Sequence, residues 1–110
     1  MKSKVQEIAK SKLNELKEAY AKGSNALVNA VFHDCLGFYY YASENTVYSG
    51  VEITFTYGRP SVYLNTLKGK LACQWGDDRH EIDLRHEAPN LLEAVDDIYE
   101  VIYEQGELQS

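Results

Sequence analysis

Regular alternation of apolar and polar residues in the middle of the chain limits the folds it can adopt. From Val51 to Tyr57 the apolar residues fall at every second position, and polar residues fill the positions between them. Successive side chains of a strand point to opposite faces, so this pattern predicts a strand with one buried face and one open face. A sheet built from such strands needs cover on its apolar side, which helices supply in an α+β protein.

Turns containing glycine or proline divide the central sequence into several strands. The segments between them keep the two-residue period, so we expect an antiparallel sheet of about four to five strands. The expected strands are Phe38–Ala42, Val47–Tyr57, Ser61–Thr66, Lys70–Trp75 and His80–Arg85.

Helical periodicity marks both ends of the chain. Residues 3–22 predict a first helix, and Ser24 is the expected N-cap of a shorter one over about 25–35. A last helix is expected to start near Glu87–Asn90 and to end at Gly106. The predicted fold is therefore a single α+β domain, residues 1–110, with two N-terminal helices and one C-terminal helix in the order ααββββα.

The last third of the chain is strongly acidic. From Asp77 to Ser110 there are eleven carboxylates against two arginines, and neither Lys nor Arg follows Arg85. On the predicted last helix, acids spaced three or four residues apart face each other, at a cost of about 0.2–0.5 kcal/mol per like-charged pair. The acids of this helix are Glu93, Asp96, Asp97, Glu100 and Glu104.

Two interpretations of this acidic helix are open. In the first, residues 1–22, with six Lys and three Glu, lie alongside it, so that Lys10 and Lys17 face the carboxylates. In the second, the carboxylates imitate the charge of a nucleic-acid backbone and dock into a basic cleft of a partner protein. Affinity also needs aromatic or apolar anchors, for which Tyr99 and Tyr103 are the candidates.

A second candidate surface lies on the outward face of the predicted sheet. Tyr63 is its expected centre, with Asp77 and Asp78 in a nearby turn. Asp77 also belongs to a set of metal-ligand types with His80 and His86, but acids after glycine are ordinary turn residues. We therefore expect no metal and no cofactor at this place.

Catalytic motifs are not apparent. In the segment His33-Asp34-Cys35, neighbouring side chains of a helix point about 100° apart, so a thiol and its base do not converge. Cys35 is more typical of a small packed residue. We therefore predict that the protein is not an enzyme.

The net charge of −6 disfavours direct nucleic-acid binding and favours a basic protein partner. The polar, lysine-rich start of the chain, the two cysteines and the absence of a long apolar run favour a cytoplasmic protein without membrane attachment. The aromatic strand Phe38–Ala42 is compatible with pairing to a copy of itself, which makes a homodimer one expected state.

The stretch Tyr57–Thr66, followed by Gly69, Leu71 and Trp75-Gly76-Asp77, contains a Gly-x-Pro turn, a strand, a glycine turn and a strand ending in Trp-Gly. This pattern resembles small acidic proteins encoded by phages, plasmids and other mobile elements. Some of those proteins are anti-CRISPR or antirestriction inhibitors, which block a host nuclease complex, often at its nucleic-acid site.

The resemblance implies a non-enzymatic inhibitor of a CRISPR effector or restriction enzyme, acting in the host cytoplasm if it is phage-encoded. The alternative is a general interaction module, such as an immunity-type protein that neutralises another basic partner.

Overall fold

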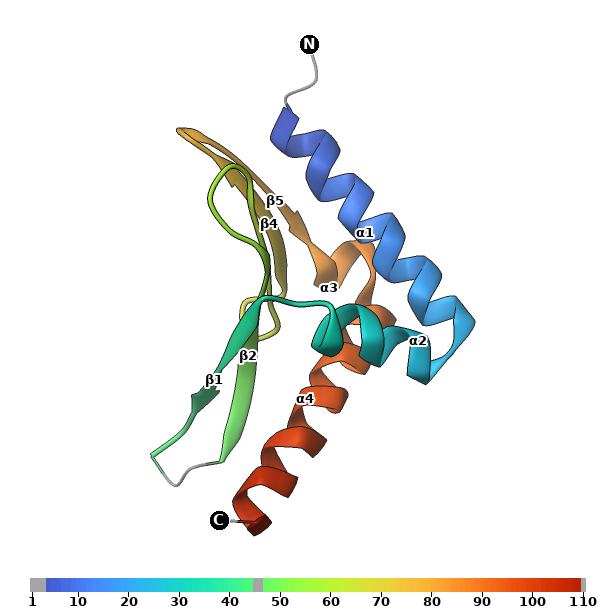
Figure 1. Ribbon diagram of the computed structural model, residues 1–110, viewed down its shortest axis with the longest axis vertical. Coiled ribbons are helices and arrows are strands. Elements are labelled where there is room, and N and C mark those ends of the chain that lie inside the picture. The colour runs from blue at the N-terminus through green and yellow to red at the C-terminus, as the bar shows by residue number, and fades with distance from the viewer. Residues whose placement is uncertain (1–3, 45–46, 110) are drawn as a thin grey trace.

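The computed structural model describes residues 4–44 and 47–109, which form an antiparallel sheet with helices against one face (Figure 1). Each strand pairs with its neighbour in sequence, so the five strands form a meander with β1 and β5 at its edges. The strands are β1 (Gly37–Ala42), β2 (Tyr48–Thr56), β3 (Ser61–Asn65), β4 (Lys70–Trp75) and β5 (Asp78–Asp83).

Helices precede and follow the sheet. The helices are α1 (Lys4–Lys22), α2 (Ser24–Val28) with its π-helical continuation η1 (Asn29–His33), α3 (Leu84–Glu87) and α4 (Pro89–Gln109). The predicted α+β class and antiparallel sheet are confirmed. The predicted order ααββββα is wrong in detail, because a short extra helix, α3, stands between the sheet and the last long helix.

Helix α3 replaces the end of a predicted strand. The side chain of Asp83 accepts a 3.0 Å hydrogen bond from the backbone N–H of Arg85, so it caps a new helical turn. Leu84 is fully buried, but it belongs to this helical turn and not to the strand predicted over His80–Arg85. The cap therefore ends β5 at Asp83.

Several other predicted boundaries also differ. Gly23, with φ of 127°, is the N-cap of α2, and Ser24 forms no capping side-chain bond. Helix α4 continues through Gly106, and Tyr57 lies beyond β2 with 84% of its surface exposed. Positions 45–46, between the predicted strands Phe38–Ala42 and Val47–Tyr57, and residue 3 of the first predicted helix lie outside the described residues.

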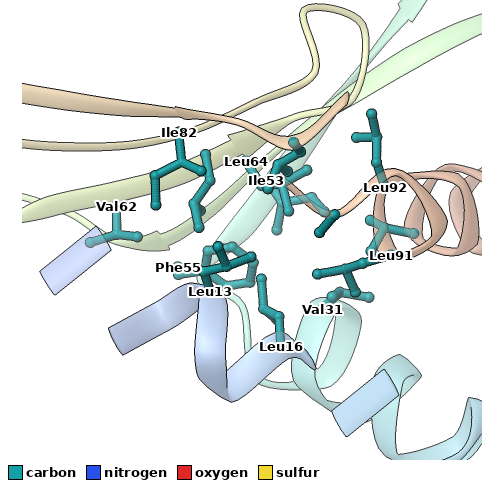
Figure 2. Packing of buried hydrophobic residues seen from close by; sticks show 14 of the residues in the cluster. Leu13, Leu16, Val31, Ile53, Phe55, Val62, Leu64, Ile82, Leu91 and Leu92 are labelled. Atoms are coloured by element: carbon teal, nitrogen blue, oxygen red, sulfur yellow. The ribbon is translucent and has the colours of Figure 1, made fainter. Parts of the chain in front are cut away.

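The core lies between the sheet and the helices (Figure 2). Ile53, Leu64, Leu71 and Ile82 form one row of paired residues across β2 to β5, all on the covered face. Helix α1 packs over β4 and β5, whereas α4 packs over β2. The two long helices therefore cover different parts of the sheet and diverge from each other (Figure 1).

Candidate functional site

Four exposed carboxylates follow one side of α4, and we call them the acidic stripe. The opposite side of the helix carries its buried residues, among them Val95 and Tyr99. With about 3.6 residues per turn, the spacing of the acids keeps them on the solvent side along the helix. The acidic stripe consists of Glu93, Asp97, Glu100 and Glu104.

The lysines of α1 do not form ion pairs with the acidic stripe. The two ion pairs among the described residues are Lys12–Glu15 at 3.4 Å and Arg79–Glu81 at 2.7 Å, both outside α4. Lys17 lines a pocket with residues at the start of α4, before the stripe begins. Lys10 lies about two turns closer to the N-terminus of α1 than Lys17 does. The first interpretation, in which Lys10 and Lys17 face the carboxylates of the last helix, is therefore not supported by any ion pair among the described residues.

The charge distribution on α4 is unfavourable for an isolated helix. The helix contains no Lys, Arg or His, and its last turn carries no basic residue. Glu93 and Asp97 are four residues apart, a repulsive spacing for two carboxylates. Glu104 is also four residues from Glu100, a repulsive spacing. A basic group placed against this surface would relieve both effects.

Asp96 does not belong to the exposed stripe. It is half-buried and accepts a 2.6 Å hydrogen bond from the hydroxyl of Tyr48 on β2. The pKa of Tyr48 is raised well above its ordinary value, mainly by burial and in second place by this hydrogen bond to a carboxylate. Asp96 therefore joins α4 to the sheet, and its role in partner binding stays a prediction.

Tyr99 is not available as an anchor. Its exposed fraction is 0%, and its hydroxyl donates a 2.7 Å hydrogen bond to the backbone oxygen of Val31. The ring packs edge-on against Phe32 and Phe38, and burial raises the pKa of its hydroxyl. The expectation that Tyr99 contacts a partner is therefore wrong for this fold.

Tyr103 is half-buried against the β1–β2 hairpin. Its ring centroid lies 4.9 Å from that of Tyr40 and 5.8 Å from that of Tyr48. This packing fixes the ring beside the hairpin, so only part of its surface is open to a partner.

Two apolar features that the sequence analysis missed lie beside the acidic stripe. A pocket of about 270 Å³ opens between α1, α2 and α4, and Asp97 of the stripe is part of its wall. Val101, one turn after Asp97, is 52% exposed. The remaining pocket residues are Tyr20, Gly23, Ser24, Leu27, Ala94 and Ile98. Because three separate helices build this pocket, no local sequence pattern reveals it.

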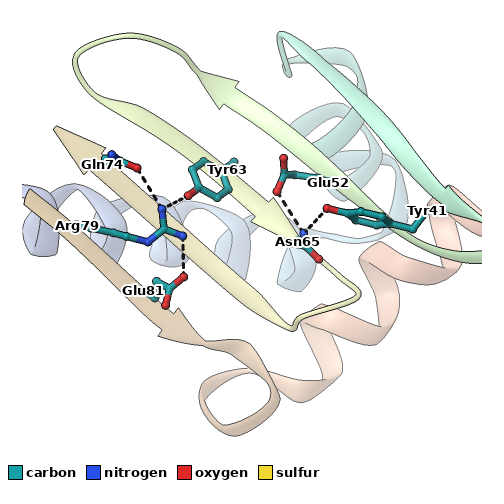
Figure 3. A network of polar contacts seen from close by, with 7 residues as sticks. All are labelled: Tyr41, Glu52, Tyr63, Asn65, Gln74, Arg79 and Glu81. Carbon is teal, nitrogen blue, oxygen red and sulfur yellow. Dashed lines mark hydrogen bonds and ion pairs between the residues drawn. The ribbon is translucent and has the colours of Figure 1, made fainter. Parts of the chain in front are cut away.

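The predicted second surface is an ordered polar face of the sheet (Figure 3). Arg79 donates hydrogen bonds to the Tyr63 hydroxyl, to Gln74 at 3.1 Å and to Glu81 at 2.7 Å. The hydrogen bond from Arg79 lowers the pKa of Glu81. Arg79 therefore fixes Tyr63 in place and has its own charge matched by Glu81.

Asp77 and Asp78 lie at one end of this open face. Asp77 follows Gly76 in the β4–β5 turn, and Asp78 begins β5 opposite Trp75. Both are exposed, and neither contacts the Tyr63–Arg79 group in any hydrogen bond or ion pair among the described residues. The register places Tyr63 across from Ala72, three residues before Trp75 on β4, so these acids and Tyr63 do not form one site.

A second polar network on the open face was not predicted. Asn65 donates hydrogen bonds to the Tyr41 hydroxyl at 2.8 Å and to Glu52 at 3.2 Å (Figure 3). The Tyr39 hydroxyl donates to the other Glu52 oxygen at 2.6 Å. Asn65 is only 3% exposed although the described helices lie against the other face of the sheet (Figure 1). Its neighbours on the adjoining strands bury it.

The described residues contain no group of three or more His, Cys, Asp or Glu arranged to hold a metal ion. Asp77, His80 and His86 accordingly do not converge on one point.

The two cysteines are packed within the protein. The thiol of Cys35 donates a 3.1 Å hydrogen bond to the backbone oxygen of Phe32, and burial raises the pKa of the Cys73 thiol. Neither cysteine forms a disulfide.

Another pocket, of about 410 Å³, lies between α1 and the β2–β3 end of the sheet. The Lys12 ammonium sits 4.2 Å above the centroid of the Phe55 ring at this place and also pairs with Glu15. Its charge is thus engaged within the wall of the pocket.

Across the described residues, none of the helices has the length and apolar character needed to cross a bilayer.

Comparisons with protein-family models, with curated proteins and with solved structures found no match for this chain. The function must therefore be argued from the residues themselves.

Proposed function

We propose that this protein is a non-enzymatic inhibitor that binds a bacterial defence nuclease, either a CRISPR effector or a restriction enzyme, in the host cytoplasm. The observation that carries the proposal is the acidic stripe. It presents four exposed carboxylates on one helix, without an ion pair to any described residue. A basic nucleic-acid cleft is a surface with complementary charge.

The dimensions of the stripe support mimicry of a nucleic-acid strand. Glu93 and Glu104 are eleven residues apart, which corresponds to about 16 Å along the helix axis. One strand of duplex DNA carries about five phosphates over that length, at roughly 3.4 Å per phosphate. Four carboxylates over the same distance give a similar linear charge density on a rigid support.

Anchoring contacts come from the apolar features next to the stripe. The pocket beside Asp97 accommodates the aliphatic part of a Lys or Arg side chain, whose charged end then meets the carboxylate. Val101 adds exposed apolar surface on the same side of the stripe. Charge on the stripe would steer the encounter, and these contacts would slow dissociation.

The second candidate is an immunity-type module that binds another basic protein, such as a toxin. It uses the same acidic stripe and therefore predicts the same dependence on charge. The two functions differ in the partner, which a biochemical assay separates.

The test is a DNA-cleavage assay with a panel of purified CRISPR effectors and restriction enzymes. We expect the protein to inhibit at least one of them and the variant Asp97→Lys/Glu100→Lys to lose inhibition. The control Glu7→Lys/Glu18→Lys changes the net charge equally on exposed positions of α1 and should inhibit normally. Equal inhibition by both variants would reject the acidic stripe as the surface that binds the nuclease. A panel without any inhibited nuclease would reject the nuclease as the partner.

A further inference from the structure

The two edges of the sheet are protected to different degrees. Strand β5 carries Asp78, Arg79, Glu81 and Asp83, and α1 packs against it. Charged residues on an edge strand oppose pairing with another strand. Strand β1, Gly37–Ala42, has neither a charged residue nor a proline, and a register shift affects only its end, between Tyr41 and Ala42. Among the described residues, β1 is paired on its β2 side alone.

The backbone of β1 offers hydrogen-bonding groups on its open side. Val51 of β2 is turned toward β3, because its N–H and C=O both bond to Thr66 at 2.9 Å. Backbone groups alternate in direction along a strand, so Glu52 is turned toward β1, where it pairs with Tyr39. The backbone groups of Phe38 and Tyr40 consequently point outward from the sheet.

The side chains of β1 make this edge apolar and ordered. Leu36 and Phe38 are exposed, and Tyr39 is 51% exposed. The Tyr39 hydroxyl is held by Glu52 at 2.6 Å and lies 3.1 Å from the Tyr41 hydroxyl. These bonds hold the aromatic side chains in place before any partner arrives, which lowers the entropy cost of association.

We propose that β1 is a dimerisation edge, at which two copies of this chain pair antiparallel with Tyr39 opposite Tyr39 of the partner subunit. The two five-stranded sheets then form one continuous sheet. In this register, the outward backbone groups of Phe38 meet those of Tyr40 of the partner subunit. Gly37 lies opposite Tyr41 of the partner subunit, where an aromatic ring covers the glycine backbone.

A second copy fits this edge for two reasons. The chain has a net charge of −6, which opposes association of two copies over most of its surface, but β1 is uncharged. The register centred on Tyr39 also gives each aromatic residue of β1 an aromatic or glycine neighbour, and aromatic cross-strand pairs are stabilising. This inference does not depend on the proposed function, since the acidic stripe lies on a different element.

The mass of the protein in solution tests the proposal. Sedimentation equilibrium should give a dimer that dissociates on dilution. Tyr39→Lys removes the central aromatic pair, places two lysines opposite each other and should give a monomer, with circular dichroism as the check that the variant is folded. Tyr57→Lys, on an exposed turn away from β1, should remain dimeric. A wild-type monomer at the highest soluble concentration, or a Tyr39→Lys dimer, would overturn the proposal.

Cross-linking tests the register. The central pair at Tyr39 is of the non-hydrogen-bonded type, with Cα atoms about 4.5 Å apart, which lies within the range for a disulfide. Under mild oxidation, Tyr39→Cys should form a covalent dimer and Tyr57→Cys should not. Failure of Tyr39→Cys to cross-link would reject this register even if the protein is dimeric.

Discussion

The hydroxyl of Tyr48 donates a 2.6 Å hydrogen bond to Oδ1 of Asp96, which joins strand β2 to helix α4. This contact divides the acids of α4 into two groups. Asp96 faces the sheet and is half-buried, whereas the acidic stripe faces solvent. Because the contact orients α4 on the sheet, it also determines the direction in which the stripe points.

Removal of the Tyr48 hydroxyl should destabilise the protein without weakening partner binding. Tyr48→Phe leaves the half-buried Asp96 carboxylate without this donor, so we expect the free energy of unfolding to fall by about 1–3 kcal/mol. Urea denaturation measures the change. Tyr57→Phe, at an exposed residue, is the control and should have no effect. An unchanged stability of Tyr48→Phe would show that the bond contributes nothing.

The stability of the protein should fall at alkaline pH. Burial raises the pKa values of Tyr40, Tyr48 and Tyr99 above the ordinary 10.0, so these hydroxyls stay protonated in the folded chain. In the unfolded chain they ionise near pH 10. Their contribution is therefore complete below pH 10 and is lost as pH rises above it. Denaturation curves at increasing pH, with tyrosinate absorbance as a second signal, measure the loss. A stability that stays constant through pH 10 would contradict this expectation.

Glu104→Lys should stabilise the protein while weakening inhibition. The new cation attracts Glu100 four residues earlier, where two carboxylates now repel each other. We expect the free energy of unfolding to rise by about 0.5–1 kcal/mol, measured by urea denaturation. A decrease would mean that Glu104 already has a favourable partner within the protein.

Alanine substitutions at Gly50 and at Gly106 should change the free energy of unfolding in opposite directions. A Cβ atom at Gly50 would lie 2.9 Å from the Leu67 Cβ and 3.1 Å from its backbone nitrogen. Gly50→Ala should therefore lower the free energy of unfolding by about 1–3 kcal/mol. Gly106 lies within α4 with nothing near the added Cβ, so Gly106→Ala should raise it by about 0.5–1 kcal/mol. Urea denaturation of the two variants measures both changes. Equal changes in the free energy of unfolding would contradict the prediction.

Local patterns were sufficient to predict most of the sheet and both long helices. The alternation that places Val51, Ile53 and Phe55 on one face depends only on the strand period, and all three are buried. The turn at Asp83 was misjudged because apolar Leu84 fits a strand and a capped helix equally well. The side-chain hydrogen bond of Asp83 to Arg85 decides between them.

The candidate site depended more on tertiary packing. Tyr99 occupies an apolar position of its helix, but its complete burial requires Phe32 and Phe38 from distant segments. Asn65 lies on the open face of the sheet, yet neighbouring strands bury it. The absence of ion pairs between α1 and the acidic stripe follows from the directions of two helices on the sheet, which no sequence period specifies.

Displacement of DNA from the target nuclease tests the central claim most directly. Fluorescently labelled duplex DNA would be bound to a nuclease that the protein inhibits, and its release would be followed by fluorescence anisotropy as the protein is added. We predict that the wild type releases the DNA, whereas Asp97→Lys/Glu100→Lys leaves it bound. Simultaneous binding of DNA and the wild-type protein, or equal release by the variant, would contradict the account.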